Sequence, residues 1–331
     1  MRSTQPVATR QAPASAEEPR RALLSPARRD ALFGILLRAV AVLVAALCVL
    51  VGVVLVVRSV PALQRFGMSF LWGTTWDPVQ QVFGALPFLF GTVVTSVLAL
   101  LLAVPLSVGT AIFLAEVAPR WLAAPISFAV ELLAAIPSIV YGLWALFVLV
   151  PALQPVELWL SEHAGFIPLF RGAPYGVGML AGALVLAIMV TPFITAVTRD
   201  VILAVPHSIR EASYALGATR WETVVRGVLQ YGRTGILGAV VLGLGRAMGE
   251  TMAVTMVIGN TPQISASLFD PAYTMASVLA NEFTEATYAL YLSALIEIGL
   301  LLFVFTIVVN AAGRLLVLRT RGVAAGTGVV A

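Results

Sequence analysis

The stretch Arg246-Ala-Met-Gly-Glu250 lies near the middle of a hydrophobic run that extends from Ile236 to Gly259. The run is long enough to cross a bilayer as a helix, which takes roughly 20 residues. Each ionisable group at mid-membrane costs about 2.5–3.5 kcal/mol on insertion scales, so such groups mark a function or a pair. Their i, i+4 spacing predicts that both side chains lie on one helix face. They indicate either a path for a polar solute or an ion pair that clamps two helices.

The composition places the chain in a membrane. It has 331 residues, of which 60% are hydrophobic and 11% are charged, and its mean hydropathy is +0.98. Soluble domains have roughly 25% charged residues. The net charge of +4 does not indicate nucleic-acid binding, because positive charge in membrane proteins mostly records orientation.

The residue types that are absent also exclude functions. All 20 basic residues are Arg, and a Walker A loop requires Lys, so this chain cannot carry one. If ATP drives the protein, the ATPase is another polypeptide. The single Cys48 can form no internal disulfide, and His163 and His207 lie in different loops without a second ligand nearby. We therefore predict neither a metal site nor a cofactor.

Hydropathy predicts an all-α membrane protein with six spans. Residues 1–30 are rich in Pro, Ala, Ser and Arg and are predicted to be a disordered cytoplasmic tail. Residues 31–318 form the transmembrane domain, and residues 319–331 form a C-terminal tail. The first apolar run is too long for a signal peptide and lacks a cleavage site. The predicted spans are Leu32–Val57, Phe88–Leu114, Ile126–Val150, Gly176–Val197, Ile236–Gly259 and Tyr288–Val317.

Arginine in the loops sets the predicted orientation, because cytoplasmic loops carry the excess of positive charge. The tail before the first span has six Arg, and the loop 198–235 has five. The loops on the other side hold few, and residues 260–287 hold none. Both termini and the loop 198–235 are therefore predicted to be cytoplasmic.

Two further acids fall within predicted spans. Glu131 lies near the inner end of the third span, where it can reach the interface. Glu297 lies deeper, so it either pairs with an Arg of another subunit or stays protonated. Small residues in the fifth span permit close helix approach. They are Gly238, Gly243, Gly245 and Gly249.

The loop 198–235 has the pattern of two short helices. Ser208 with Glu211 fits a capping box, and Gly217 fits a helix terminator after Leu216. A second helix is predicted to begin near Thr219. Its predicted apolar face consists of Trp221, Val224 and Val225. The loop fits either a surface that a soluble partner grips or an amphipathic connector on the lipid surface.

Part of this loop resembles a known motif. Glu211-Ala212-Ser-x-x-x-Gly217 is similar to the EAA motif of bacterial ABC-importer permeases, which docks into a cleft of the ATPase subunit. The resemblance implies the MetI-like, type I permease fold, with Glu211, Ala212 and Gly217 coupling to the ATPase. The chain departs from the motif after Leu229, where Gln230 stands in place of the family's Pro.

Further motifs narrow the resemblance. Over residues 30–318 the chain resembles the PstC family of phosphate-specific permeases. The segments that carry the resemblance are Leu71–Pro78, Phe83–Thr92, Ala135–Gly142, Pro174–Gly178 and, most closely, Gly243–Asn260.

This resemblance implies a permease subunit that imports inorganic phosphate across the bacterial cytoplasmic membrane by alternating access. The implied partners are a homologous PstA-like permease, two PstB-like ATP-binding subunits and a PstS-like extracytoplasmic phosphate-binding protein. Arg246 becomes the cation of the phosphate pathway, because its planar fork matches phosphate oxygens. Glu250 holds the guanidinium when no anion is bound.

Two other functions also fit these residues, and a third does not. A permease for another oxyanion, such as sulfate or molybdate, has the same architecture and coupling loop. A non-transporting phosphate-sensing scaffold in the membrane is a further alternative. A membrane enzyme such as a lipid-phosphate hydrolase needs a cluster of His, Asp or Ser, which two scattered histidines do not supply.

Overall fold

The computed structural model describes residues 26–326 and the side chains of residues 30–319. The predicted tails therefore lie largely outside the described residues, although helix α1 (Pro26–Phe66) begins at Pro26 and α13 (Ala289–Gly326) continues past residue 318. The chain divides into two units, Met1–Val51 and Gly52–Ala331. The second unit contains every feature described below.

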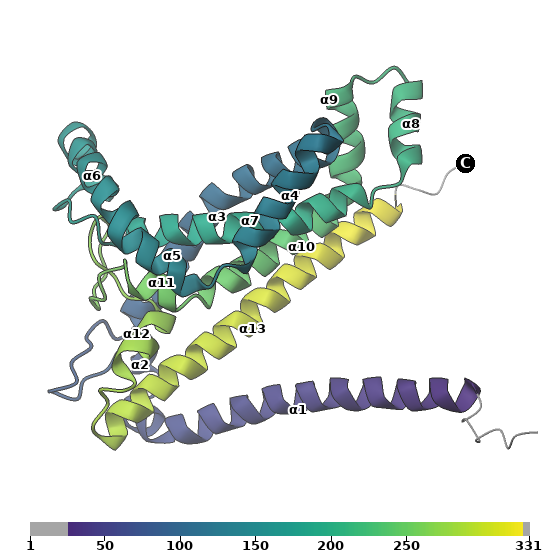
Figure 1. The fold of residues 1–331 in the computed structure, drawn as a ribbon. Coiled ribbons are helices and arrows are strands. Elements are labelled where there is room, and N and C mark those ends of the chain that lie inside the picture. Colours follow the sequence, from purple (N-terminus) through teal and green to yellow (C-terminus); the bar gives the residue numbers. More distant parts are fainter. Residues whose placement is uncertain (1–25, 327–331) are drawn as a thin grey trace, which may run out of the picture. The chain divides into compact units, whose positions relative to one another are not determined.

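The second unit is helical throughout (Figure 1). In the described residues, β-pairing is limited to the isolated bridges Asp77–Val82 and Gly259–Ala272. After α1 the elements are α2 (Ser69–Trp72), α3 (Leu86–Ile112), η1 (Phe113–Val117), α4 (Arg120–Ala135), α5 (Ser138–Trp144), η2 (Ala145–Leu149), α6 (Val150–Ala164), η3 (Pro168–Phe170), α7 (Met179–Leu203), α8 (His207–Ala215), α9 (Arg220–Glu222), η4 (Thr223–Val228), α10 (Leu229–Met248), α11 (Met252–Thr255), α12 (Met275–Glu282) and α13.

Six helical segments of the described residues are long and apolar enough to cross a membrane. They are Asp30–Phe66, Leu86–Val117, Ser138–Ala164, Met179–Leu203, Arg220–Met248 and Ala289–Arg319. The predicted number is thus confirmed, but the bounds of several spans were wrong, and the third and fifth differ at both ends. The third segment begins at Ser138 because Pro137 separates it from α4, and proline cannot donate the helical hydrogen bond. The fifth ends at Met248 instead of Gly259.

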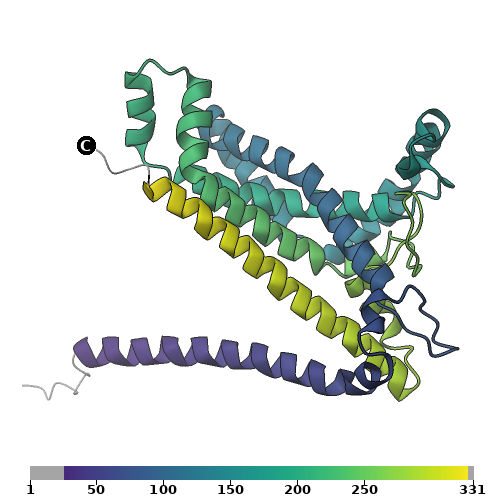
Figure 2. The ribbon, with the colours of Figure 1, turned by 180° about the vertical axis from the view of Figure 1, so that it is seen from behind.

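Helices α3 and α7 lie side by side in the core, α10 packs on α7, and α13 packs on α10 (Figures 1 and 2). Glycine permits these contacts. A Cβ on Gly243 would lie 2.6 Å from Cδ1 of Ile194 in α7, and one on Gly313 would lie 2.5 Å from Cγ1 of Val241. Small residues thus let the backbones approach closely, as membrane helices require. Gly238, by contrast, has no atom within 4 Å.

An aromatic cluster closes the end of the unit that holds α2 and α12. Trp76 is 8% exposed and contacts the rings of Phe83 and Phe88 edge to face. The indole Nε1 of Trp76 and the hydroxyl of Tyr291 both donate to Oε2 of Glu282, each at 2.7 Å. These donors satisfy a carboxylate that would otherwise be costly to bury.

The same end is held by close backbone contacts between α3 and the segment that precedes α12. A Cβ on Gly91 would lie 2.2 Å from the carbonyl oxygen of Tyr273. At the next residue, Oγ1 of Thr92 accepts a 2.9 Å hydrogen bond from the backbone N–H of Met275. Burial raises the pKa of Tyr273 to about 12, and Nδ2 of Asn281 donates a 3.1 Å hydrogen bond to its hydroxyl.

We expect Gly91→Ala to lower the thermal unfolding midpoint of the detergent-purified protein. The added methyl group has to displace backbone, and overpacking of this kind costs about 1–3 kcal/mol. Gly109→Ala, on the same helix, is the matched control, because a Cβ there meets nothing within 4 Å. An equal midpoint shift in both variants would contradict the contact.

Candidate functional site

The helix that carries Arg246 ends before Glu250. Helix α10 stops at Met248, and α11 begins only at Met252. Oε1 of Glu250 accepts a 3.1 Å hydrogen bond from the backbone N–H of Ala253, so this carboxylate supports the first turn of α11. The prediction that Arg246 and Glu250 share one helix face was therefore wrong, because the helix breaks between them.

Arg246 is exposed in this chain. Its guanidinium carbon lies 5.6 Å from the centre of the Phe193 ring on α7, a cation–π contact that orients the side chain. Ion pairs among the described residues include Arg199–Glu131, Arg199–Asp200 and Arg210–Glu116, but Arg246 and Glu250 form none with each other. The predicted pairing with Glu250 is thus not present. The planar donor fork of Arg246 is available to an anion.

A second helix break lies against the first. Helix α4 ends at Ala135 and α5 begins at Ser138. The hydroxyl of Tyr141 donates a 2.9 Å hydrogen bond to the carbonyl of Leu133, which satisfies one of the last carbonyls of α4. A Cβ on Gly142 would lie 3.0 Å from Cα of Ala253. The two broken segments therefore pack together through glycine.

The two other acids that the sequence places within spans, Glu131 and Glu297, differ in their surroundings. Glu131 accepts a 2.9 Å charge-assisted hydrogen bond from Arg199, which also bonds Asp200 at the same distance. Its partner was not predicted, because the pair joins α4 to α7 across 68 residues. Glu297 is 3% exposed, and its Oε2 has no hydrogen-bond partner among the described residues.

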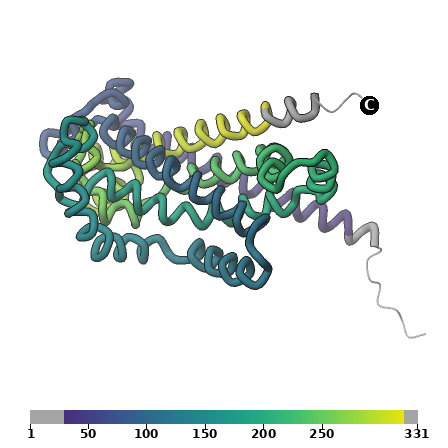
Figure 3. Tube along the Cα trace, turned by 90° about the horizontal axis from the view of Figure 1, so that it is seen from above, coloured from purple at the N-terminus to yellow at the C-terminus, as the bar shows by residue number. Residues whose placement is uncertain are grey.

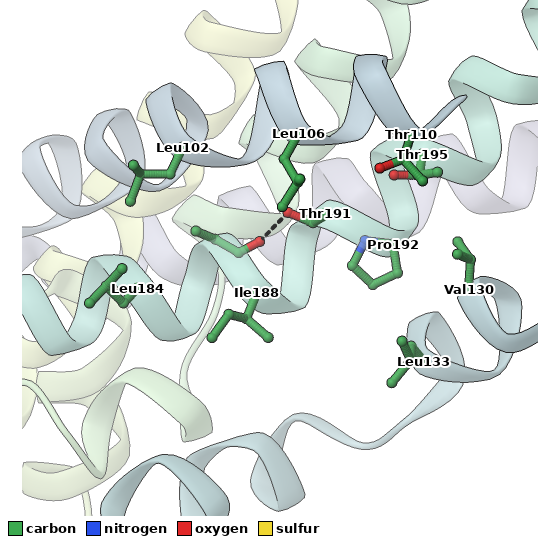
Figure 4. Close-up of a pocket in the computed structure, with 11 residues that line it drawn as sticks. Leu102, Leu106, Thr110, Val130, Leu133, Leu184, Ile188, Thr191, Pro192 and Thr195 are labelled. Atoms are coloured by element: carbon green, nitrogen blue, oxygen red, sulfur yellow. Dashed lines mark hydrogen bonds between the residues drawn. The ribbon is translucent and has the colours of Figure 1, made fainter. Parts of the chain in front are cut away.

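A groove of about 500 Å³ lies between α3, α4 and α7 (Figure 4). Aliphatic side chains such as Leu106 and Ile188 line it. The Thr191 hydroxyl donates to the carbonyl of Ala187 at 2.7 Å instead of facing a ligand. Because an unpaired ion is costly in apolar surroundings, this groove does not fit a charged solute.

Residues 207–228 contain the predicted coupling residues and are called the coupling segment below. They form helix α8 and the helix α9–η4, joined by a turn, at one end of the unit (Figure 3). Helix α8 ends where expected. Gly217 has a φ of +82°, and the N–H groups of Gly217 and Ala218 donate to the carbonyls of Tyr214 and Ser213 at 2.9 and 3.1 Å. These are the two bonds of a Schellman motif. The left-handed backbone explains why glycine stands at this position.

The capping prediction was wrong for the first helix of this segment. Pro206 occupies the N-cap of α8, and no side chain caps it. The capping box lies instead at Thr219, whose Oγ1 accepts from the N–H of Glu222 while the Glu222 carboxylate accepts from the N–H of Thr219.

The predicted apolar face of the second helix is also not a single face. Val224 is 4% exposed, whereas Trp221 is 69% exposed. The π-helical geometry of η4, which begins at Thr223, changes the spacing on which that prediction depended.

A cluster of hydrogen bonds that sequence analysis missed anchors the coupling segment. Arg210 donates through Nη2 and Nε to Oε1 of Glu116 at 2.5 and 3.1 Å, and through Nη1 to the carbonyl of Val205 at 2.7 Å. Arg220 donates to the backbone carbonyl of Glu116. The arginine side chain bridges α8 to η1 across 94 residues, so no local pattern indicates it.

The predicted coupling residues lie on the surface. Glu211, Ala212 and Gly217 are exposed, and the neighbouring Leu216 is 89% exposed. A shallow pocket of about 330 Å³ lies beside them. A large apolar side chain on a polar surface is typical of a protein interface.

A sequence model of the family described as binding-protein-dependent transport system inner membrane components matches residues 107–322. The chain belongs to this family. The permease architecture and the multi-pass location in the cytoplasmic membrane follow. A member is the membrane subunit of an importer that also has an ATPase and a binding protein, and it is not itself an enzyme.

Curated relatives cover nearly the whole chain. The phosphate transport system permease protein PstC of Mesorhizobium japonicum is 52% identical over 296 residues, which are 88% of this chain and 90% of the relative. PstC of Haemophilus influenzae is 50% identical, with 84% and 89% covered. PstC 2 of Mycobacterium tuberculosis is 40% identical, with 88% and 93% covered.

A solved structure shares the fold. A chain of the inward-facing MetNI methionine ABC transporter superposes with a TM-score of 0.50 at 17% identity, over 74% of this chain and 99% of that chain. At this identity the likeness concerns the fold alone.

We expect Arg210→Ala to loosen α8. Breaking a buried ion pair costs about 3–5 kcal/mol, and the Arg210–Glu116 pair is only 15% and 13% exposed. Amide hydrogen exchange across α8 in the purified protein should therefore accelerate at least tenfold. Arg226→Ala, an exposed arginine of the same segment, is the control and should leave exchange unchanged. Unchanged α8 exchange in Arg210→Ala would show that other contacts hold the segment.

Proposed function

We propose that this chain is the permease subunit of an ATP-driven importer of inorganic phosphate. The observation that carries the proposal is the 52% identity, over 88% of this chain, to a protein named phosphate transport system permease PstC. The exposed Arg246 beside a helix break is the structural feature that fits an anion.

Arg246 is the anion-binding residue of the pathway in this proposal. Its guanidinium offers a planar fork that matches phosphate oxygens and never loses its charge. It stands at the end of α10, in the segment Arg220–Met248 that is apolar enough to span the membrane. Charged residues at this depth usually face a pathway or a bundle interior.

Glu250 contributes differently from what its spacing predicts. Its carboxylate is bonded to the backbone of α11, so it supports the first turn of α11 and does not pair with Arg246. The arginine then needs no partner to be displaced before phosphate binds.

The coupling segment is the surface that meets the ATPase. We place it, together with both termini, on the cytoplasmic side, in agreement with the distribution of arginine. Two PstB-like subunits bind below the membrane, a PstA-like permease completes the pathway, and a PstS-like protein delivers phosphate from outside. ATP binding moves the coupling segments together, and the paired permeases alternate between outward and inward access.

Two alternatives receive less support. A sulfate or molybdate permease has the same fold, but the three relatives compared above are all named for phosphate. If the chain were a phosphate-sensing scaffold that transports nothing, the exposed Arg246 in an apolar span would have no role.

Arg246→Gln is expected to abolish uptake of radiolabelled phosphate in cells that co-express all four subunits. Glutamine keeps a similar length but lacks the permanent charge that attracts phosphate. The complex should still assemble and hydrolyse ATP. Arg65→Gln, an exposed arginine far from the break, should import normally. Normal phosphate uptake by Arg246→Gln would rule out this role, and sulfate uptake by the wild type would overturn the substrate.

Glu211→Lys and Gly217→Val are expected to uncouple ATP hydrolysis from transport. The first reverses the charge of the coupling surface, and the second places a branched side chain at a φ of +82°, which costs about 1–2 kcal/mol or more. In proteoliposomes the phosphate imported per ATP hydrolysed should fall severalfold. Ser208→Ala is the control, because its side chain caps no helix. An unchanged ratio in both variants would place coupling elsewhere.

A further inference from the structure

Helix α13 carries an amide side chain in the middle of an apolar segment. Asn310 lies within Ala289–Arg319, which is long and apolar enough to span the membrane. Polar groups in such segments usually bond across helices or line a pathway. Nδ2 of Asn310 donates a 2.9 Å hydrogen bond to the carbonyl of Thr306 on its own helix, which does not explain why an amide stands there.

The amide of Asn310 lies against the residue that precedes Arg246. A Cβ built on Gly245 would lie 3.4 Å from Oδ1 of Asn310 and 3.6 Å from Nδ2. The absence of a side chain at Gly245 thus brings α13's amide next to the backbone that carries Arg246. The close approach of Gly313 to Val241, one turn further along, shows that the two helices stay in contact there.

One face of α10 is left uncovered by the described residues of the second unit. We call it the uncovered strip and define it as Gly238, Leu242, Arg246 and Gly249, whose spacing places them on one helix face. Gly238 meets nothing within 4 Å, Leu242 is 55% exposed, and the other two are exposed. Phe193 of α7 flanks Arg246, and Asn310 of α13 flanks the neighbouring Gly245.

The hydrogen bond to Thr306 fixes which way the amide points. Nδ2 donates to that carbonyl, and a flipped amide would place two acceptors against each other, so Oδ1 is the atom left to accept. This oxygen is also the atom nearest to Gly245. An acceptor next to the backbone that carries Arg246 suits an anion that still carries a proton.

We propose that Asn310 is a second phosphate-contacting residue of the pathway, with Oδ1 accepting the hydrogen bond of the protonated phosphate oxygen while Arg246 binds the charged oxygens. The inference rests on the proposed function. Inorganic phosphate keeps a proton at neutral pH, whereas sulfate has none to donate. An acceptor that finds no donor is penalised, which is how a site built for one hydrogen bond rejects an analogue that lacks it.

The test uses the complete importer in proteoliposomes, with inorganic phosphate as the probe. Asn310→Leu keeps the approximate shape of the side chain but removes its hydrogen bonds. We expect phosphate uptake to fall roughly tenfold, the usual scale for losing a hydrogen bond to a charged group. ATP hydrolysis stimulated by the loaded binding protein should persist. Val308→Ala, two residues away and so on the opposite side of α13, should import normally.

A labelling measurement separates pathway lining from helix packing. The chain has one cysteine, so Cys48→Ser gives a cysteine-free background in which Asn310→Cys or Val308→Cys is introduced. A charged methanethiosulfonate should react at position 310, and phosphate should slow that reaction. Position 308 should be neither labelled nor protected.

The outcomes separate this inference from the proposed function. If Arg246→Gln stops uptake while Asn310→Leu transports as much phosphate per ATP as the wild type, the inference is wrong and the function stands. If the wild type imports no phosphate, both are wrong. Should Asn310→Leu fail to assemble, labelling decides, and a reaction at position 310 that phosphate does not slow would overturn the inference.

Discussion

The bilayer core offers no water to backbone groups, so each helix break within it has to be satisfied by the protein. This constraint shapes the region around Arg246. The carboxylate of Glu250 accepts from the first turn of α11, the hydroxyl of Tyr141 donates to the end of α4, and Nδ2 of Asn260 donates to the carbonyl of Thr255 at 2.8 Å. Each side chain thus supports a break that would otherwise leave backbone groups unpaired.

The helix breaks determine the surroundings of Arg246. Because α10 stops at Met248, Arg246 stands in its last turn and next to irregular backbone, not in the middle of a continuous helix. The glycine contact between α5 and α11 holds the two breaks together. The contacts of α7 and α13 with α10 leave the uncovered strip exposed within the part of the chain that the structure describes.

The coupling segment and Arg246 belong to one stretch of helix. Helices η4 and α10 form one continuous helical stretch from Thr223 to Met248. Helix α8 packs on η4. A displacement of α8 therefore acts directly on the helix that carries Arg246. The Arg210–Glu116 pair ties α8 to η1 as well. Both features connect the surface helix α8 to the membrane segments through packed helices.

The sequence by itself determined the membrane class, the number of spans, the need for a separate ATPase and the glycine that ends α8. These properties depend on composition or on a few consecutive residues. The tertiary structure decided where two spans begin and end, that Glu250 bonds Ala253 instead of Arg246, that Arg210 reaches Glu116, and that Asn310 lies beside Gly245. Hydropathy averages over a window and reports preference for lipid. It does not report which distant backbone and side-chain groups satisfy one another, and those pairings position the site.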